Sequence, residues 1–93
     1  MIKVRFLRSF DESLAYLPER ERVKARKAVH RLLDYFQGGP KPIGMGLRKL
    51  RSPYWEVRAS LACRVVFALE RELATFILVG SHDEVRRVLA RHA

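Results

Sequence analysis

Residues 47–82, LRKLRSPYWEVRASLACRVVFALERELATFILVGSH, decide the fold that we expect for this chain of 93 residues. Four segments rich in apolar, β-branched and aromatic residues follow one another in this stretch, separated by short polar connections. They are Leu47–Leu50, Tyr54–Ser60, Cys63–Leu69 and Ala74–Val79. Strands joined by connections this short pair as antiparallel hairpins. The stretch therefore predicts a β-meander of about four strands.

The N-terminal part of the chain predicts one strand followed by two helices. Residues 2–6 (IKVRF) alternate apolar and basic side chains, which is the pattern of a strand with one buried face. Residues 9–12 (SFDE) match a capping box, in which a serine hydroxyl and a glutamate carboxylate satisfy free backbone N–H groups. A short helix should therefore run to about Tyr16. Pro18 fits the first position of a second helix, and residues 38–40 (GGP) end it.

The second helix carries the clearest periodicity in the chain. Its apolar residues recur at spacings of three and four, which places them on one face. They are Ala25, Ala28, Val29, Leu32, Leu33 and Phe36. Charged residues occupy most of the remaining positions: Arg20, Lys24, Arg26, Lys27, Arg31 and Asp34. This basic face has two interpretations, an ordinary solvated surface or a surface that binds a polyanion.

The remaining segments complete a single domain over residues 1–93. Pro40–Met45 predicts an irregular loop before the meander. A final helix begins at Ser81, in a second capping box with Glu84, and runs to about Arg91. We therefore expect an α+β fold with an N-terminal strand, two helices, an antiparallel β-meander of about four strands and a short C-terminal helix. The helices should cover one side of an antiparallel sheet.

The composition indicates a soluble protein with polyanionic partners. The formal net charge is +9, and residues 41–64 supply +5 of it through six Lys or Arg and one acid. Such a charge favours nucleic acid, an anionic membrane surface or an acidic protein as a partner. No apolar run is long enough for a membrane span, and basic residues interrupt the N-terminus, so we expect a cytoplasmic protein without a signal peptide. The lone Cys63 fits a small core residue in a reducing compartment.

Two arms of the meander should bring basic side chains and a histidine to one place. Alternate residues of a strand share a face, so Glu56 and Arg58 should point together, away from the core. If the hairpin pairs as expected, Arg64 lies near Arg58, and His82 at the exit of the last strand can reach the same face. Guanidinium groups hold phosphates and an imidazole transfers protons, so this set suits the binding and cutting of a phosphodiester in RNA. Because the histidines and the cysteine lack metal-ligand spacing, we expect neither a metal nor a cofactor.

Five segments occur in one consistent order along nearly the whole chain. They are Leu17-Pro18-Glu19, Gly46-Leu47-Arg48-Lys49-Leu50, Tyr54-Trp55-Glu56-Val57-Arg58, Arg64-Val65-Val66-Phe67 and Val79-Gly80-Ser81-His82-Asp83-Glu84-Val85-Arg86. As an ordered set they resemble the RelE/ParE superfamily of bacterial and archaeal toxins from type II toxin–antitoxin systems. The resemblance implies a RelE-like fold and is closer to RelE than to ParE.

RelE-like members of this superfamily cut mRNA in the ribosomal A site, so the resemblance implies a ribosome-dependent mRNA endonuclease that inhibits translation. Arg58 and Arg64 fall where RelE-like nucleases keep phosphate-binding residues, and Glu56 and His82 resemble their catalytic base and acid. Arg86 stands where a Tyr is common, which could keep a phosphate contact but removes a stacking ring. Attack by the 2′-hydroxyl would leave a 2′,3′-cyclic phosphate without a metal. Four further cations are expected to contact the RNA backbone without reading its sequence: Lys41, Arg48, Lys49 and Arg51.

Alternatives stay open for the residues and for the function. Arg64 and Glu56 could form a structural ion pair, and His82 could be an ordinary residue of the first turn of a helix. ParE-like members inhibit DNA gyrase without catalysis of their own, and a non-toxic relative that binds RNA or an antitoxin is a further possibility. In each case the resemblance implies a cognate antitoxin, whose acidic segment would cover the cationic site in a toxin–antitoxin hetero-oligomer.

Overall fold

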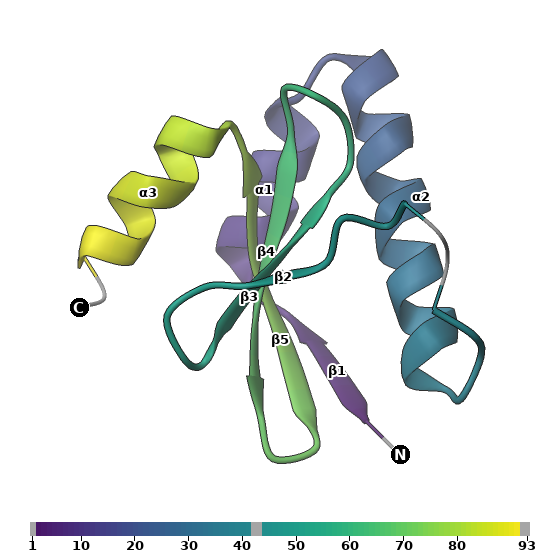
Figure 1. Cartoon of the computed structure of the whole chain (residues 1–93). Coiled ribbons are helices and arrows are strands. Elements are labelled where there is room, and N and C mark those ends of the chain that lie inside the picture. The colour runs from purple at the N-terminus through teal and green to yellow at the C-terminus, as the bar shows by residue number, and fades with distance from the viewer. Residues whose placement is uncertain (1, 42–43, 92–93) are drawn as a thin grey trace.

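The computed structural model describes residues 2–41 and 44–91 (Figure 1). The first part of the chain contains β1 (Lys3–Phe6), α1 (Arg8–Tyr16) and α2 (Glu19–Phe36). The second part contains β2 (Arg48–Lys49), β3 (Tyr54–Arg58), β4 (Arg64–Glu70), β5 (Leu73–Gly80) and α3 (His82–Arg91). The predicted α+β class and the order of elements are confirmed, while positions 42 and 43 of the predicted loop lie outside the described residues. In the described part of the chain, no helix combines the length and the apolar character that crossing a bilayer requires.

The five strands of the described chain form one sheet in the order β1-β5-β4-β3-β2. Antiparallel pairing of β2 with β3, β3 with β4 and β4 with β5 confirms the predicted meander. The prediction of a wholly antiparallel sheet is wrong, because β1 pairs in parallel with β5. These two strands are far apart in the sequence, so no short connection imposes antiparallel pairing on them.

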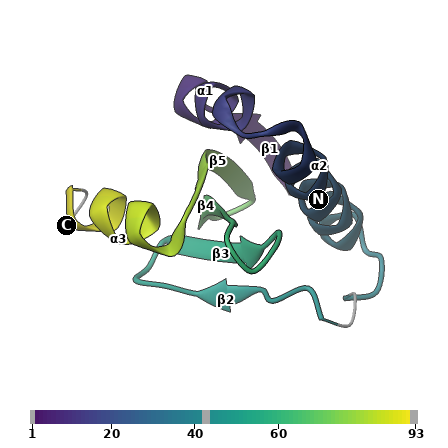
Figure 2. The ribbon, with the colours of Figure 1, turned by 90° about the horizontal axis from the view of Figure 1, so that it is seen from above.

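Helices lie on both faces of the sheet, so the prediction that they cover one side is wrong. Figures 1 and 2 place α1 and α2 on one side and α3 on the other. The cause is that the central strands are apolar on both faces. Val65 and Phe67 join the main core, whereas Val66 and Leu78 form a second cluster with Val85 of α3. α3 removes this second apolar surface from water.

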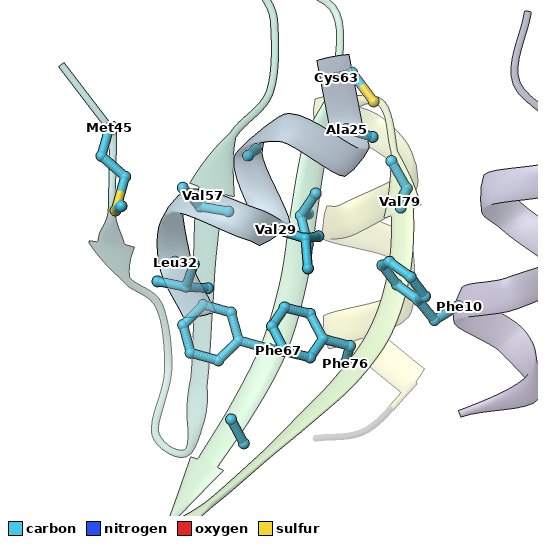
Figure 3. Packing of buried hydrophobic residues seen from close by; sticks show 13 residues of the cluster. Phe10, Ala25, Val29, Leu32, Met45, Val57, Cys63, Phe67, Phe76 and Val79 are labelled. Carbon is cyan, nitrogen blue, oxygen red and sulfur yellow. The ribbon is translucent and has the colours of Figure 1, made fainter. Parts of the chain in front are cut away.

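The main core lies between the sheet and α1 and α2 (Figure 3). Phe67 and Phe76 lie near its centre, with their ring centres 5.4 Å apart. Phe10 of α1 packs edge-on against Phe76, with the ring centres 5.7 Å apart. The buried residues of α2 confirm the predicted helical periodicity: Ala25, Ala28, Val29 and Leu32.

A bulge in β5 makes this packing possible. Val66 pairs with Leu78 and Phe67 pairs with Phe76, so Ile77 is an additional residue in β5. One added residue reverses the alternation of side chains along a strand. Phe76 therefore faces the main core, in which Val79 is also buried.

The Ser9 capping box predicted for α1 is wrong. α1 begins at Arg8 with Leu7 as its N-cap residue, and no side chain caps it. The Ser9 hydroxyl instead donates a hydrogen bond to the carbonyl oxygen of Ile77, at 2.6 Å. This contact ties α1 to the bulge of β5, so a tertiary partner has replaced the local one.

β1 also differs from the prediction of one buried face. All four of its residues are exposed, and Phe6 retains 42% of its accessible surface. The strand lies at the edge of the sheet, where Phe6 contacts Phe76 at 5.0 Å between ring centres but has open solvent on its outer side. At the start of α2, Pro18 is the N-cap residue rather than the first helical residue.

Cys63 is buried in the main core, as predicted. Burial raises the pKa of its thiol to about 11, with the carboxylate of Glu21 adding to the rise and Arg64 opposing it. The thiol therefore stays protonated at neutral pH, and protonated thiols are poor nucleophiles. Cys63 acts as a small core residue.

Candidate functional site

The second face of β3 and β4 carries the charged residues that the sequence singled out. Val57 is fully buried in the main core, so the alternation of β3 places Glu56 and Arg58 on the opposite face. Arg58 pairs directly with Arg64 across the hairpin, which confirms the predicted pairing. Residues paired in this way have Cβ atoms about 5 Å apart. The hairpin therefore brings two guanidinium side chains to neighbouring positions.

Glu56 lies between two arginines on the flanking strands. Its Oε2 is 3.9 Å from Nε of Arg48 on β2 and 3.8 Å from Nε of Arg64 on β4. The side chain of Glu56 is 7% exposed, compared with 14% for Arg64 and 65% for Arg48. Burial strengthens the attraction between Glu56 and Arg64, whereas water screens the pair with Arg48.

Arg64 also stabilises the turn between β3 and β4. Its Nη1 donates hydrogen bonds to the carbonyl oxygens of Ser60 at 2.9 Å, Leu61 at 3.3 Å and Cys63 at 3.3 Å. Residues 60–62 contain no Gly or Asn, so these bonds hold a turn that its own sequence does not favour. The ion pair with Glu56 that the sequence allowed is present, and phosphate binding by Arg64 stays a prediction.

Three of the predicted site residues are exposed: Arg58, which pairs with Arg64, and His82 and Arg86 on α3. Arg58 has no ion pair within the described part of the chain. Gly80, at the end of β5, pairs with Arg64, and His82 begins α3 two residues later. Arg86 lies four residues further along α3, on the same helix face as His82. Within the described residues, no cluster of three or more His, Cys, Asp or Glu side chains could hold a metal ion.

The predicted capping box at the start of α3 is present and fixes the position of His82. The backbone N–H of Ser81 donates to Oε1 of Glu84 at 2.9 Å, and the N–H of Glu84 donates to Oγ of Ser81 at 3.2 Å. The hydrogen bond from the Ser81 backbone, followed by the one with its side chain, lowers the pKa of the Glu84 carboxyl. His82 therefore follows a residue whose backbone and side chain are both hydrogen-bonded.

Replacing Ser81 by alanine is expected to lower the free energy of unfolding at pH 7 by about 1 kcal/mol, the usual effect of losing an N-cap side chain. Urea unfolding of the two proteins measures this difference.

The contribution of Glu84 to the free energy of unfolding should depend on pH. Because its folded pKa is lowered, the stability it adds is present above the unfolded pKa of about 4.3 and is lost as the pH falls through the folded value. Urea unfolding of the wild type and Glu84→Gln at pH 7 and pH 3 checks this. A stability difference that stays constant between these pH values would contradict it.

The cations predicted to contact RNA do not form one free surface. Arg48 forms an ion pair with Glu56. The Nζ atom of Lys49 lies 6.0 Å from the centre of the Trp55 ring, close enough for a cation–π contact. Lys41 is exposed and immediately precedes the positions that the structure does not describe. Their contacts with RNA stay predictions.

Arg51 has a structural contact that no sequence pattern signals. Its Nη2 donates a hydrogen bond to the carbonyl oxygen of Leu89, at 2.6 Å, across 38 residues of sequence. Carbonyl groups in the last turns of a helix have no partner within the helix, and cations are favoured there. Arg51 therefore helps to hold α3 against the connection between β2 and β3.

Comparisons with known proteins find this fold in solved structures but find no related sequence. No family model and no curated protein matches the sequence. A chain of the E. coli DinJ-YafQ complex matches with a TM-score of 0.74 and 14% identity, over 91% of this chain and 98% of that chain. A chain of the RelB-RelE antitoxin-toxin complex from Methanococcus jannaschii matches with a TM-score of 0.69 and 12% identity, over 90% and 96% of the two chains.

The YoeB dimer from Staphylococcus aureus supplies a third match, with a TM-score of 0.63 and 20% identity over 87% of this chain and 97% of that chain. At identities this low the likeness shows the fold alone. That fold is the one of the RelE-like toxins, as the resemblance in the sequence implied.

Proposed function

We propose that this protein is the toxin of a type II toxin–antitoxin system and that it cuts mRNA on the ribosome. The supporting observation is the match in fold, over about nine tenths of the chain, to chains of two toxin–antitoxin complexes. Because one fold hosts several activities, the residues at the site must also suit the chemistry. Here a buried carboxylate and an exposed arginine come from β3, and a histidine and a second exposed arginine come from α3.

The proposed reaction is an internal attack within the RNA. A ribose 2′-hydroxyl loses its proton and attacks the adjacent phosphorus, and the bond to the 5′-oxygen of the next nucleotide breaks. The products are a 2′,3′-cyclic phosphate and a 5′-hydroxyl. His82 donates the proton that the departing 5′-oxygen needs, and Arg58 stabilises the charge on the phosphorane oxygens. Arg86, on the same face of α3 as His82, binds a neighbouring phosphate.

Glu56 is the proposed base for the 2′-hydroxyl. Its carboxylate is buried and lies between Arg48 and Arg64, so RNA must displace one arginine to reach Oε2. Arg48 is the one that can move, because it is mostly exposed and surface ion pairs contribute only about 0–1 kcal/mol. Arg64 stays in place through its hydrogen bonds to the turn.

The proposed partner that controls this activity is a cognate antitoxin in the cytoplasm. Three of the matched structures are complexes of an antitoxin with a toxin. A chain of net charge +9 would attract an acidic antitoxin segment, and covering His82 and the exposed arginines would block RNA.

Induced expression of this chain without an antitoxin is expected to arrest bacterial growth and to produce cuts in translated messages. Primer extension maps the cuts, and purified mRNA should stay intact unless ribosomes are added. Plasmid supercoiling measured in the same cells is the control, and it should not change. Growth arrest with intact messages and altered supercoiling would replace the proposal with gyrase inhibition.

A second candidate is a non-catalytic relative that binds RNA or an antitoxin. One observation favours it, because the guanidinium group of Arg64 is largely buried and already bonded to three carbonyl groups and to Glu56. A phosphate would have to compete with these partners. The expression experiment separates the two candidates, since this relative would neither arrest growth nor cut messages.

A further inference from the structure

A small pocket beside α2 is lined by four cations, three of which the proposed cleavage does not use. It has a volume of about 80 Å³ and lies between α2, the segment 44–45 and residues 57–59 of β3 and its exit. Space of this size accepts several water molecules or one small anionic group. Four cations line it: Lys24, Lys27 and Arg31 from α2, and Arg58 from β3.

The positive charge around this pocket is not balanced by the protein itself. None of the residues that line the pocket is acidic. None of the four cations forms an ion pair within residues 2–41 and 44–91. On α2, Lys27 lies three residues after Lys24 and four before Arg31, so like charges are neighbours on one face and repel each other. An anion bound here would relieve that repulsion.

The floor of the pocket strengthens its attraction for anions. Ala28, Met45 and Val57 form this floor, and all three are buried. An apolar floor excludes water beneath the cations, which reduces screening and directs their field outward. Gly46 allows the segment 44–46 to lie close against β3. Its φ is +67°, which favours glycine, and a Cβ at this position would lie only 2.9 Å from the Cβ of Arg58.

We propose that this pocket binds a backbone phosphate of RNA next to the proposed cleavage site, with which it shares Arg58. The inference goes beyond the proposed function, since it holds whether or not the protein cuts RNA. A phosphate group accepts several hydrogen bonds at once, which suits a pocket lined by lysines and arginines from two elements. A polyanion also suits the net charge of +9, because its repeated phosphates release many counterions when they meet a basic surface.

The test is a comparison of two double variants of α2 with equal changes in charge. Lys27→Gln with Arg31→Gln removes two cations of the pocket and leaves Arg58 in place. Arg20→Gln with Arg26→Gln removes two exposed cations of the same helix that do not line the pocket. The probe is a short fluorescent 2′-O-methyl RNA, which cannot undergo attack by a 2′-hydroxyl. Fluorescence anisotropy measures its Kd for the whole chain at several salt concentrations.

The pocket variant is expected to bind this RNA about tenfold more weakly and to lower the slope of log Kd against log salt by about one. The control variant should change the affinity by less than about twofold, and both should keep the thermal midpoint of the wild type. Equal losses in the two variants would overturn the proposal, since they would show binding by general surface charge.

An acidic peptide provides the second arm of the test. A polyglutamate peptide of the same net charge as the RNA is titrated against the same proteins. A loss in the pocket variant that is larger for the peptide than for the RNA would assign the pocket to a protein partner and overturn the proposal. None of these measurements involves cleavage or ribosomes, so their failure leaves the proposed endonuclease function untouched.

Discussion

Replacing His82 by glutamine is expected to slow ribosome-dependent mRNA cleavage by about 10²–10⁴-fold, the range that a positioned general acid contributes. His82 begins α3 at an exposed position, where β5 ends beside Arg64. No hydrogen bond or ion pair holds its side chain within the described part of the chain. Glutamine therefore removes the proton donor while changing the free energy of unfolding by less than about 0.5 kcal/mol. Time courses of cleavage on translated messages measure the first effect, and thermal unfolding measures the second.

His30 offers a matched control for this experiment. It is also an exposed histidine, but it lies on α2 and lines a cavity between α1 and α2, away from the second face of β3 and β4. His30→Gln should cut messages at the rate of the wild type. If His82→Gln cuts as fast as His30→Gln, another group supplies the proton and the proposed role of His82 is wrong. Arg64 is a poorer choice for such a test, because its replacement also removes the bonds that hold the β3–β4 turn.

The elements that the sequence predicted well are those whose signals are local. β4 was predicted at Cys63–Leu69 and found at Arg64–Glu70, because a continuous apolar run between polar turns marks it. The two capping boxes show where local signals fail. Ser81 bonds Glu84 as predicted, but Ser9, with the same spacing to its glutamate, bonds the carbonyl oxygen of Ile77 instead. That partner is 68 residues away, so no local pattern could reveal it.

The sequence predicted which residues of the candidate site pair across the hairpin, but it did not predict how deeply Glu56 is buried. A hairpin of short connection places Arg58 opposite Arg64, and the structure has this register. The burial of Glu56 depends on β2, a strand of two residues. The meander predicted that this strand pairs with β3, but it did not predict the register that places Arg48 opposite Glu56. The two-sided covering of the sheet and the bulge at Ile77 likewise depend on packing between distant elements.

Replacing Glu56 by glutamine is expected to lower the free energy of unfolding by about 3 kcal/mol, at the low end of the range for removing one partner of a buried ion pair. The amide keeps the shape of the side chain but leaves Arg64, which is largely buried, without its counter-charge and opposite Arg58. The low end applies because Arg64 keeps its bonds to three carbonyl groups and Arg48 can turn into solvent. For a chain of this size the thermal midpoint should fall by roughly 15 °C.

Glu70→Gln is the matched control, since Glu70 is exposed at the end of β4 and its replacement should change stability by less than about 0.5 kcal/mol. Cleavage by Glu56→Gln then separates two roles of the carboxylate. A base that takes the 2′-hydroxyl proton predicts loss of cleavage even at temperatures where the variant is fully folded. A carboxylate that only positions the arginines predicts that cleavage declines in step with unfolding. A Glu56→Gln protein as stable as the wild type would show that the two arginines do not depend on this charge.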